Sequence, residues 1–202
     1  MNKIITVGRE FGSGGRELGR RLAEALGFEY YDKEIVSEIA AHTSLSEEYI
    51  KQVLECTPHR LYPITVGHSM APGEDYTFRQ IQTIFEAQSE ILKRMAETSN
   101  CVIVGRCADY ILRDYKPFRL FVHASLESRV ARCAARERDD ETFTEKKLKR
   151  NILRIDKNRA RYYGFYTGRK WGAKENYDMC VNTTNTDIKA IVPVLAKIFK
   201  ED

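Results

Sequence analysis

One stretch near the amino terminus constrains the fold most. The β-branched run Ile4-Ile5-Thr6-Val7 leads into a glycine-rich turn, Gly12-Ser13-Gly14-Gly15, and then into a periodic apolar helix. A buried strand delivers the chain to a turn that glycine makes tightly, and the next helix aims its unpaired N–H groups and the positive end of its dipole at an anion. We therefore expect these four residues to bind a polyphosphate. A glycine-rich turn without a ligand and a dinucleotide site are the alternatives.

This loop lacks the lysine of the nucleotide-binding pattern G-x-x-x-x-G-K-[ST]. If Gly15 is the final glycine, Arg16 takes the lysine position and Glu17 the Ser/Thr position. If Gly14 is the final glycine, Gly15 takes the lysine position and Arg16 follows one residue late. Arginine also neutralises phosphate oxygens, and it binds them in pairs. We therefore predict that Arg16 binds the donor phosphates and acts in catalysis, and that Glu17 meets them through a metal.

The composition fits one enzyme-sized domain spanning residues 1–202. A chain of this length that is 43% apolar can bury a sizeable core without disulfides or metals. Its net charge of +4 comes from interspersed charges of both signs, which does not demand nucleic acid and suits a small anionic substrate. Five cysteines without a C-x-x-C pair, together with the lack of a signal peptide or a membrane-length apolar run, predict a soluble cytoplasmic protein.

Strands and helices alternate along the chain, which predicts a parallel sheet covered by helices on both faces. Strands are expected over residues 3–7, 28–31, 101–104, 119–124 and 177–182. The helix after the glycine loop should end at Gly27 and bury Leu18, Leu22, Ala25 and Leu26. Further helices are expected over residues 33–41, 46–54, 78–95 and 187–199. Residues 57–76, rich in proline and glycine, should form an irregular loop.

Three further segments carry a resemblance to a known family. They are Gly105-Arg106-Cys107-Ala108-Asp109 with the strand that follows, Ile155-Asp156-Lys157-Asn158-Arg159-Ala160, and Tyr30-Tyr31-Asp32. In order and spacing they resemble the nucleoside monophosphate kinases, and within them the cytidylate kinase-like family. The resemblance implies a P-loop NTPase fold, a three-layer α/β/α arrangement with a central parallel sheet. It also implies an acceptor-binding insert at about residues 32–76 and a helical lid at about 132–158.

Arginines are abundant where phosphoryl transfer needs positive charge. Arg106 lies just beyond a buried strand, at the edge where open α/β sheets bind ligands, and we expect it to bind the acceptor phosphate. Three arginines recur at helical spacing and can share one face. The resemblance implies that these three arginines lie at the lid. Arg129 and Arg136 would then contact the donor phosphates, and Arg132 would act in catalysis. A solvated helix face is the alternative.

Acidic residues near these arginines are the other candidates. Asp156 precedes Arg159 by three residues, so it can orient that guanidinium toward the acceptor phosphate; a routine surface pair is the alternative. Asp32 ends a strand, where it can hold Mg²⁺ through water, orient the acceptor for catalysis, or cap the next helix. Asp109 is expected either to bind substrate or to pair with Arg106.

These features predict an ATP- and Mg²⁺-dependent kinase of a small phosphorylated acceptor, with a nucleoside monophosphate as the favoured acceptor. Glu38 stands where the cytidylate kinases have an arginine, which disfavours cytidylate itself. The aromatic segment 161–172 either stacks a base or packs a loop and a homodimer surface. Two alternatives remain for the whole chain, namely a non-catalytic nucleotide or anion sensor that lost its lysine, and a kinase of a non-nucleotide metabolite.

Overall fold

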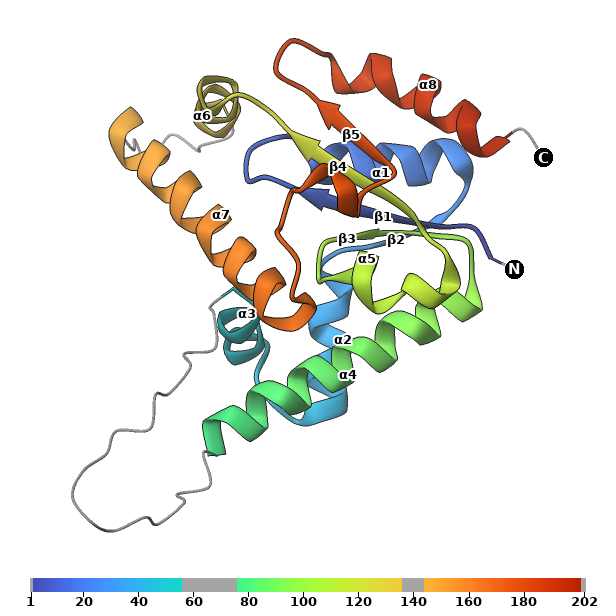
Figure 1. Cartoon of the computed structure of the whole chain (residues 1–202), viewed down its shortest axis with the longest axis vertical. Coiled ribbons are helices and arrows are strands. Elements are labelled where there is room, and N and C mark those ends of the chain that lie inside the picture. The colour runs from blue at the N-terminus through green and yellow to red at the C-terminus, as the bar shows by residue number, and fades with distance from the viewer. Residues whose placement is uncertain (1, 56–75, 136–143, 201–202) are drawn as a thin grey trace.

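The computed structural model describes residues 2–55, 76–135 and 144–200. Its centre is one sheet of five strands in the order β2-β3-β1-β4-β5, and every pair of neighbours is parallel (Figure 1). This confirms the expected sheet, and each strand lies within two residues of its prediction. The strands are β1 (Ile4–Arg9), β2 (Glu29–Tyr31), β3 (Cys101–Val104), β4 (Phe118–His123) and β5 (Met179–Asn182).

Helices cover both faces of the sheet, which gives the three layers. Helices α1 and α8 pack together on one face, and α2, α4 and α5 cover the other, while α6 and α7 stand beyond the carboxyl ends of the strands (Figure 1). The helices are α1 (Gly15–Leu26), α2 (Glu34–Thr43), α3 (Glu47–Glu55), α4 (Tyr76–Thr98), α5 (Ala108–Ile111), α6 (Leu126–Ala134), α7 (Glu145–Thr167) and α8 (Ile188–Lys200). Short 3₁₀ turns occupy Arg113–Tyr115 and Lys174–Asn176.

Side chains of the central strands alternate between two hydrophobic cores. Ile5 and Val7 face α1 and α8, whereas Ile4 faces the opposite layer. Both faces of a parallel sheet are covered in this way, which is why these strands read as continuous apolar runs. One expected core residue of α1 is wrong: Ala25 is exposed, and Ala23 is buried instead. Ala23 lies four residues after the buried Gly19, so it continues the row that faces the sheet.

Strand order determines where a ligand site can form. After β1 the chain builds β2 and β3 on one side of it, and then β4 and β5 on the other. In open α/β sheets the crevice at such a reversal, outside the carboxyl ends of the strands, is the usual ligand site. The glycine loop leaves β1 at this point. Helices α2 and α3 belong to the expected insert, and the end of α6 and the first part of α7 belong to the expected lid. The expected irregular loop, residues 57–76, lies outside the described residues apart from Tyr76, which begins α4.

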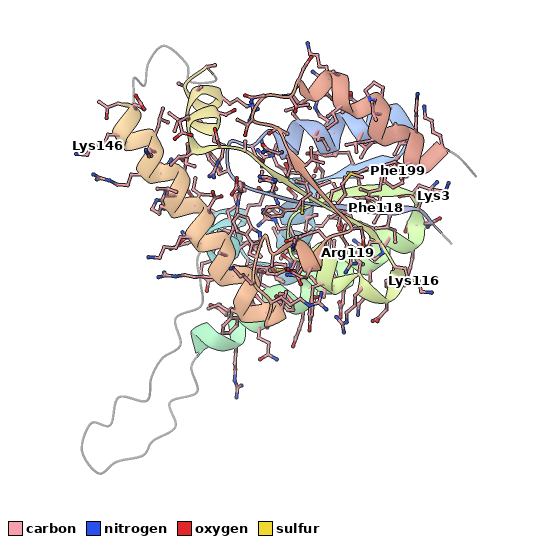
Figure 2. All side chains as sticks on the ribbon, turned by 45° about the horizontal axis from the view of Figure 1, so that its top comes forward. Lys3, Lys116, Phe118, Arg119, Lys146 and Phe199 are labelled. Carbon is pink, nitrogen blue, oxygen red and sulfur yellow. The ribbon has the colours of Figure 1, made fainter. Side chains whose placement is uncertain are left out.

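The opposite end of the sheet is closed by contacts between the termini and the strands. The ring of Phe118 meets that of Phe199 edge-on with centroids 5.0 Å apart, and Nζ of Lys3 donates a hydrogen bond to the carbonyl of Phe199 at 3.0 Å (Figure 2). Nearby, Arg119 makes a two-pronged ion pair with Asp178. Within the described ranges, no helix has the length and apolar character needed to cross a membrane.

Replacing Ile5 by alanine is expected to lower the free energy of unfolding by about 3 kcal/mol, because the residue is fully buried and a cavity would remain. Ile198→Ala is the matched control, since Ile198 is 46% exposed, and it should change stability by less than about 0.5 kcal/mol. Urea unfolding of both variants measures the difference. Equal losses would contradict this assignment of the core.

Candidate functional site

The glycine loop has the backbone geometry of an anion cradle. Gly12 and Gly14 have positive φ angles of 78° and 83°, which favour glycine. A Cβ added to Gly14 would lie 2.3 Å from Cδ1 of Ile188, so the Ile188 side chain would have to move to admit another residue. Gly14 is the N-terminal cap of α1, and Gly15 begins the helix, whose first N–H groups have no helical acceptor. Because Gly14 ends the loop, this geometry favours Gly15 for the lysine position.

Two side chains hold the outer edge of the loop at Phe11. The Asp156 carboxylate accepts the N–H of Phe11 at 2.8 Å, and Nε of Arg129 donates to the Phe11 carbonyl at 2.8 Å. Arg129 also pairs with Asp156 and, at 3.1 Å, with Glu10. Burial raises the pKa of Asp156, while the Phe11 N–H and the nearby Arg129 act to lower it. Arg129, predicted on the donor phosphates, is thus 5% exposed and bound to the loop itself.

Further along the loop, two more contacts hold carbonyl groups. Arg132, predicted to be catalytic, donates to the carbonyl of Gly12 at 3.3 Å and also contacts the carbonyl of Thr183. The hydroxyl of Thr183 donates to the carbonyl of Ser13 at 2.6 Å, while the Ser13 hydroxyl donates to the carbonyl of Glu10 at 2.9 Å. The loop is therefore supported through its carbonyl groups. Arg136, the third arginine of the predicted row, lies outside the described residues.

The side chains of Arg16 and Asp32, both predicted to act in catalysis, are in contact. Nε of Arg16 is 2.6 Å from the carboxylate of Asp32, and the Arg16 side chain is 56% exposed. Asp32 does not cap α2, whose cap position is Lys33. Glu17 pairs with Arg21 at 3.0 Å. The two predicted metal ligands, Glu17 and Asp32, line the same cavity of about 320 Å³.

Sequence reasoning missed Arg9, the last residue of β1. Its side chain is 13% exposed, and Nη2 lies 3.7 Å from the Asp32 carboxylate. Burial is the largest cause that lowers the pKa of Arg9, to about 9; the charge of Arg159 lowers it further, and Asp32 opposes the shift. A charge held under such conditions favours an anionic ligand nearby. The only signal in the sequence was that Arg9 occupies the first glycine of the nucleotide-binding pattern when Gly14 is the last.

Arg106 is presented by a left-handed turn at the end of β3. Gly105, Arg106 and Cys107 have consecutive φ angles of 77°, 60° and 53°, and two of them are not glycine. Such conformations cost about 1–3 kcal/mol each and persist only where the surroundings enforce them. Here the amide of Gln88 in α4 donates to the carbonyl of Arg106 at 3.0 Å. Burial raises the pKa of the Cys107 thiol, in keeping with a core cysteine.

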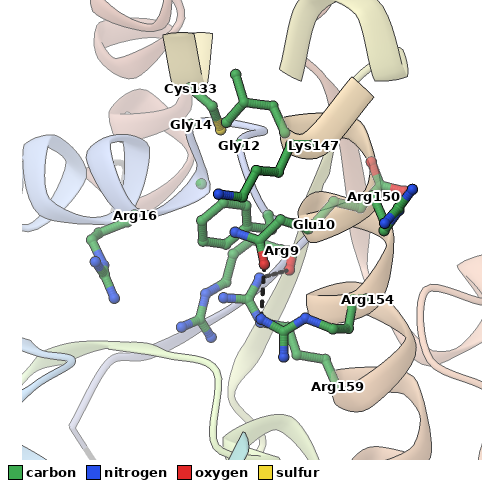
Figure 3. A pocket seen from close by; sticks show the side chains of 14 residues that line it. Arg9, Glu10, Gly12, Gly14, Arg16, Cys133, Lys147, Arg150, Arg154 and Arg159 are labelled. Atoms are coloured by element: carbon green, nitrogen blue, oxygen red, sulfur yellow. Dashed lines mark hydrogen bonds between the residues drawn. The ribbon is translucent and has the colours of Figure 1, made fainter. Parts of the chain in front are cut away.

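Asp109 and Asp156 each accept a hydrogen bond from a group other than the arginine proposed for it. The hydroxyl of Tyr163 donates to the Asp109 carboxylate at 2.6 Å, whereas burial raises the pKa of Asp109. Asp156 does approach Arg159, at 3.9 Å, but lies nearer to the Phe11 N–H. Arg159 donates to the carbonyl of Arg9 at 3.2 Å, so α7 is tied to the end of β1 (Figure 3).

Two cavities meet at this point. The larger, about 640 Å³, lies between the glycine loop and α7 and is lined by Phe11, Lys147, Leu148, Arg150, Asn151 and Arg154 among others (Figure 3). The smaller, about 100 Å³, is lined by Arg106, Asp109, Tyr162, Tyr163 and Trp171 among others. Both cavities are also lined by three arginines, Arg9, Arg16 and Arg159.

The aromatic segment 161–172 packs largely against itself and its neighbours. Tyr166 stacks on Phe85 at 3.9 Å between centroids, and Trp171 meets Phe121 edge-on at 5.4 Å. Tyr162 and Tyr163, which belong to α7, are buried in the hydrophobic core. Glu38, at the position that disfavours cytidylate, pairs with Arg94 on the surface.

A glycine loop that follows the central strand of a five-stranded parallel sheet, with arginines gathered at its edge, defines a P-loop kinase scaffold. The sequence model of the cytidylate kinase-like family matches residues 4–185, and the chain belongs to that family. No curated protein matches the sequence.

Solved structures agree with this fold. An uncharacterized protein from Eubacterium ventriosum is 26% identical with a TM-score of 0.71, and all of both chains is covered. The shikimate kinase of Bacteroides thetaiotaomicron is 15% identical with a TM-score of 0.56, over 98% of each chain. That of Acinetobacter baumannii, solved in complex with shikimate, is 14% identical with a TM-score of 0.51, over 100% of this chain and 96% of that one. At these identities the shikimate kinases show the fold alone.

Inorganic pyrophosphate is expected to raise the melting temperature, because a ligand at 100 times its Kd stabilises the folded state by about 2.7 kcal/mol. Gly14→Ala should abolish most of that gain, since the added Cβ meets Ile188 and the φ angle is left-handed. Gly164→Ala is the control, because its Cβ would meet only the Arg169 carbonyl at 3.7 Å. Differential scanning fluorimetry with and without pyrophosphate measures the gain; an undiminished gain in Gly14→Ala would exclude the loop as the cradle.

Asp109 is expected to make stability depend on pH. Its folded-state pKa is raised above the unfolded value of 3.8, so the folded protein binds more protons and wild-type stability falls as pH rises from 3.8 toward the raised pKa. Asp109→Asn removes this titration and can still accept the Tyr163 hydrogen bond. Urea unfolding from pH 3.5 to 7 should show the stability of the variant relative to wild type increasing with pH, then levelling off. A constant difference would contradict the raised pKa.

Proposed function

We propose that this protein transfers a phosphoryl group from Mg²⁺·ATP to a small phosphorylated acceptor, with a nucleoside monophosphate as the favoured one. The observation that carries the proposal is the position of Arg9, Arg16 and Arg159 on the wall shared by the two cavities. Phosphoryl transfer is catalysed mainly by positioning and by neutralising oxygens, and the transferred group must pass between donor and acceptor. Positive charge at the boundary of two cavities meets that need.

The larger cavity is assigned to the donor. Its volume of about 640 Å³ lies within the usual range for a ligand of nucleotide size. The glycine loop and the first turn of α1 supply N–H groups at one end, and Lys147, Arg150 and Arg154 of α7 supply cations on the opposite wall. Phe11 and Leu148 add apolar surface. Closure of α7 toward the loop would exclude water from the phosphates.

The smaller cavity is assigned to the phosphate of the acceptor. At about 100 Å³ it suits a phosphate group, not a whole nucleotide, so the rest of the acceptor must lie outside it. Arg106 and Arg159 face this cavity together with Arg9, and guanidinium groups bind phosphate oxygens in pairs. A phosphorylated acceptor explains this concentration of cations better than a neutral hydroxyl compound.

Magnesium would accompany the donor, neutralise charge between its phosphates and keep most of its water ligands. The acids available fit such an ion in part. Both oxygens of Asp32 already face arginines, so Asp32 fits through a bound water, and Glu17 borders the same cavity. Glu10, which lines the donor cavity, is a further carboxylate on the loop.

The test is ADP formation from Mg²⁺·ATP with a panel of nucleoside monophosphates and of phosphorylated and hydroxylated metabolites. Turnover is expected with a nucleoside monophosphate, and Arg106→Ala should lower kcat/KM for that acceptor about 100-fold because a phosphate contact is lost. Arg94→Ala is the matched control, since Arg94 pairs with Glu38 on the surface, away from both cavities. Turnover with a non-nucleotide alone would replace the acceptor class. ATP binding without any turnover would favour the sensor.

A further inference from the structure

The glycine loop has no lysine, and another residue occupies the space where a lysine side chain would begin. A Cβ added to Gly15, at the lysine position, would lie 2.5 Å from Cβ of Arg9. No side chain can therefore occupy position 15 while Arg9 keeps its place. In the other direction, the side chain of Arg9 fills the space that a residue at position 15 would need.

A second glycine, Gly105, lies far along the sequence and is next to the side chain of Arg9. A Cβ added to Gly105 would lie 1.5 Å from Nη1 of Arg9, so another residue there would displace this guanidinium. Gly105 also has a φ angle of 77° and opens the left-handed turn that carries Arg106. The Arg9 side chain thus extends from the start of the glycine loop, past Gly15, to the end of β3.

The charged groups around Arg9 are one carboxylate that attracts it and three arginines that repel it. Asp32 attracts its guanidinium at 3.7 Å, and Arg16, Arg106 and Arg159 all act to disfavour its positive charge. Arg16 is closer to Asp32, at 2.6 Å, and its side chain is 56% exposed. Of these two arginines next to Asp32, Arg9 is the more buried, with its side chain 13% exposed, and it lies beside two glycines, Gly15 and Gly105.

We propose that Arg9 supplies the positive charge that the lysine-less loop lacks, binding the phosphoryl group where the donor and acceptor cavities meet. The proposal rests on the proposed kinase function for its catalytic part. It assigns to the end of β1 a task that the nucleotide-binding pattern gives to the start of the following helix. The Cβ and the guanidinium of Arg9 also lie where side chains at positions 15 and 105 would begin, and both of these positions are glycine.

The first test removes the charge and keeps most of the volume. Arg9→Met should lower kcat about 100-fold or more, the usual effect of deleting one charge-stabilising group. Arg94→Ala should stay within threefold of wild type. Arg16→Ala is run beside them; if it loses activity about 100-fold while Arg9→Met stays within threefold, Arg16 is the missing cation and the proposal is overturned.

The second test moves the cation to its usual position. In the double variant Arg9→Gly, Gly15→Lys, the new side chain no longer meets the side chain of Arg9, and the Cβ of Val122 lies 3.1 Å away, a contact that a small shift relieves. This variant should recover at least tenfold of the activity that Arg9→Gly loses. Gly15→Lys alone should be inactive or unstable. No recovery in a folded double variant, with Arg9→Met as active as wild type, would overturn the proposal.

Binding separates this proposal from the proposed function. Calorimetric titration with Mg²⁺·ATP needs no turnover, and Arg9→Met should weaken that binding at least tenfold relative to Arg94→Ala. If the wild type binds ATP but turns over no acceptor, the proposed kinase function is wrong. The proposal for Arg9 then stands only if Arg9→Met binds Mg²⁺·ATP at least tenfold more weakly. Equal affinity in Arg9→Met and wild type would then overturn it. If Arg9→Met does not fold, Arg9→Lys replaces it, and it should retain more affinity than Arg9→Gly.

Discussion

The site depends on the hydrogen bonds that side chains of other elements donate to the carbonyl groups of the glycine loop. A backbone loop binds an anion through its N–H groups, so its carbonyl groups need other partners. Arg129 binds the carbonyl of Phe11, and Arg132 binds that of Gly12. Asp156 links this support to α7, because it accepts the Phe11 N–H and pairs with Arg129. Helices α6 and α7 thereby shape the loop without occupying it, and losing Arg129 would remove an ion-pair partner of the half-buried Asp156 and leave it the Phe11 N–H and the more distant Arg159.

Electrostatics complete this arrangement with an excess of positive charge. Arg16, Arg106 and Arg159 all disfavour the charge of Arg9, and Asp32 alone among the groups acting strongly on it opposes them. The backbone adds strain at the same place, since Arg106 and Cys107 adopt left-handed conformations supported by Gln88. Strain and like charge are each unfavourable for folding, and both are expected where a protein is preorganised for an anionic ligand. A phosphate between the cavities would relieve this repulsion.

The sequence predicted the sheet and most helices because their signals are local: apolar runs for strands, and a glycine at each end of α1. It also named Arg16 and Asp32 as catalytic candidates, and the structure brings these two side chains together. Helical spacing showed that Arg129 and Arg132 share a face of α6 but could not show what that face meets, which is the loop backbone. Arg9 was missed for a similar reason. Its importance depends on Gly15 and on Gly105 in a segment far along the chain, and a single sequence does not show that contact.

The position of Arg9 changes how the two halves of the site are connected. A lysine at the start of α1 would extend from the helix and leave the end of β1 free. An arginine at the end of β1 instead connects three strand ends: its own, Asp32 after β2, and Gly105 after β3. Arg159 adds α7 by binding the carbonyl of Arg9. In the proposed kinase, a movement of α7 toward the loop would act through this hydrogen bond on the residue beside both cavities, and would couple closure of the donor cavity to the arrangement of the acceptor cavity.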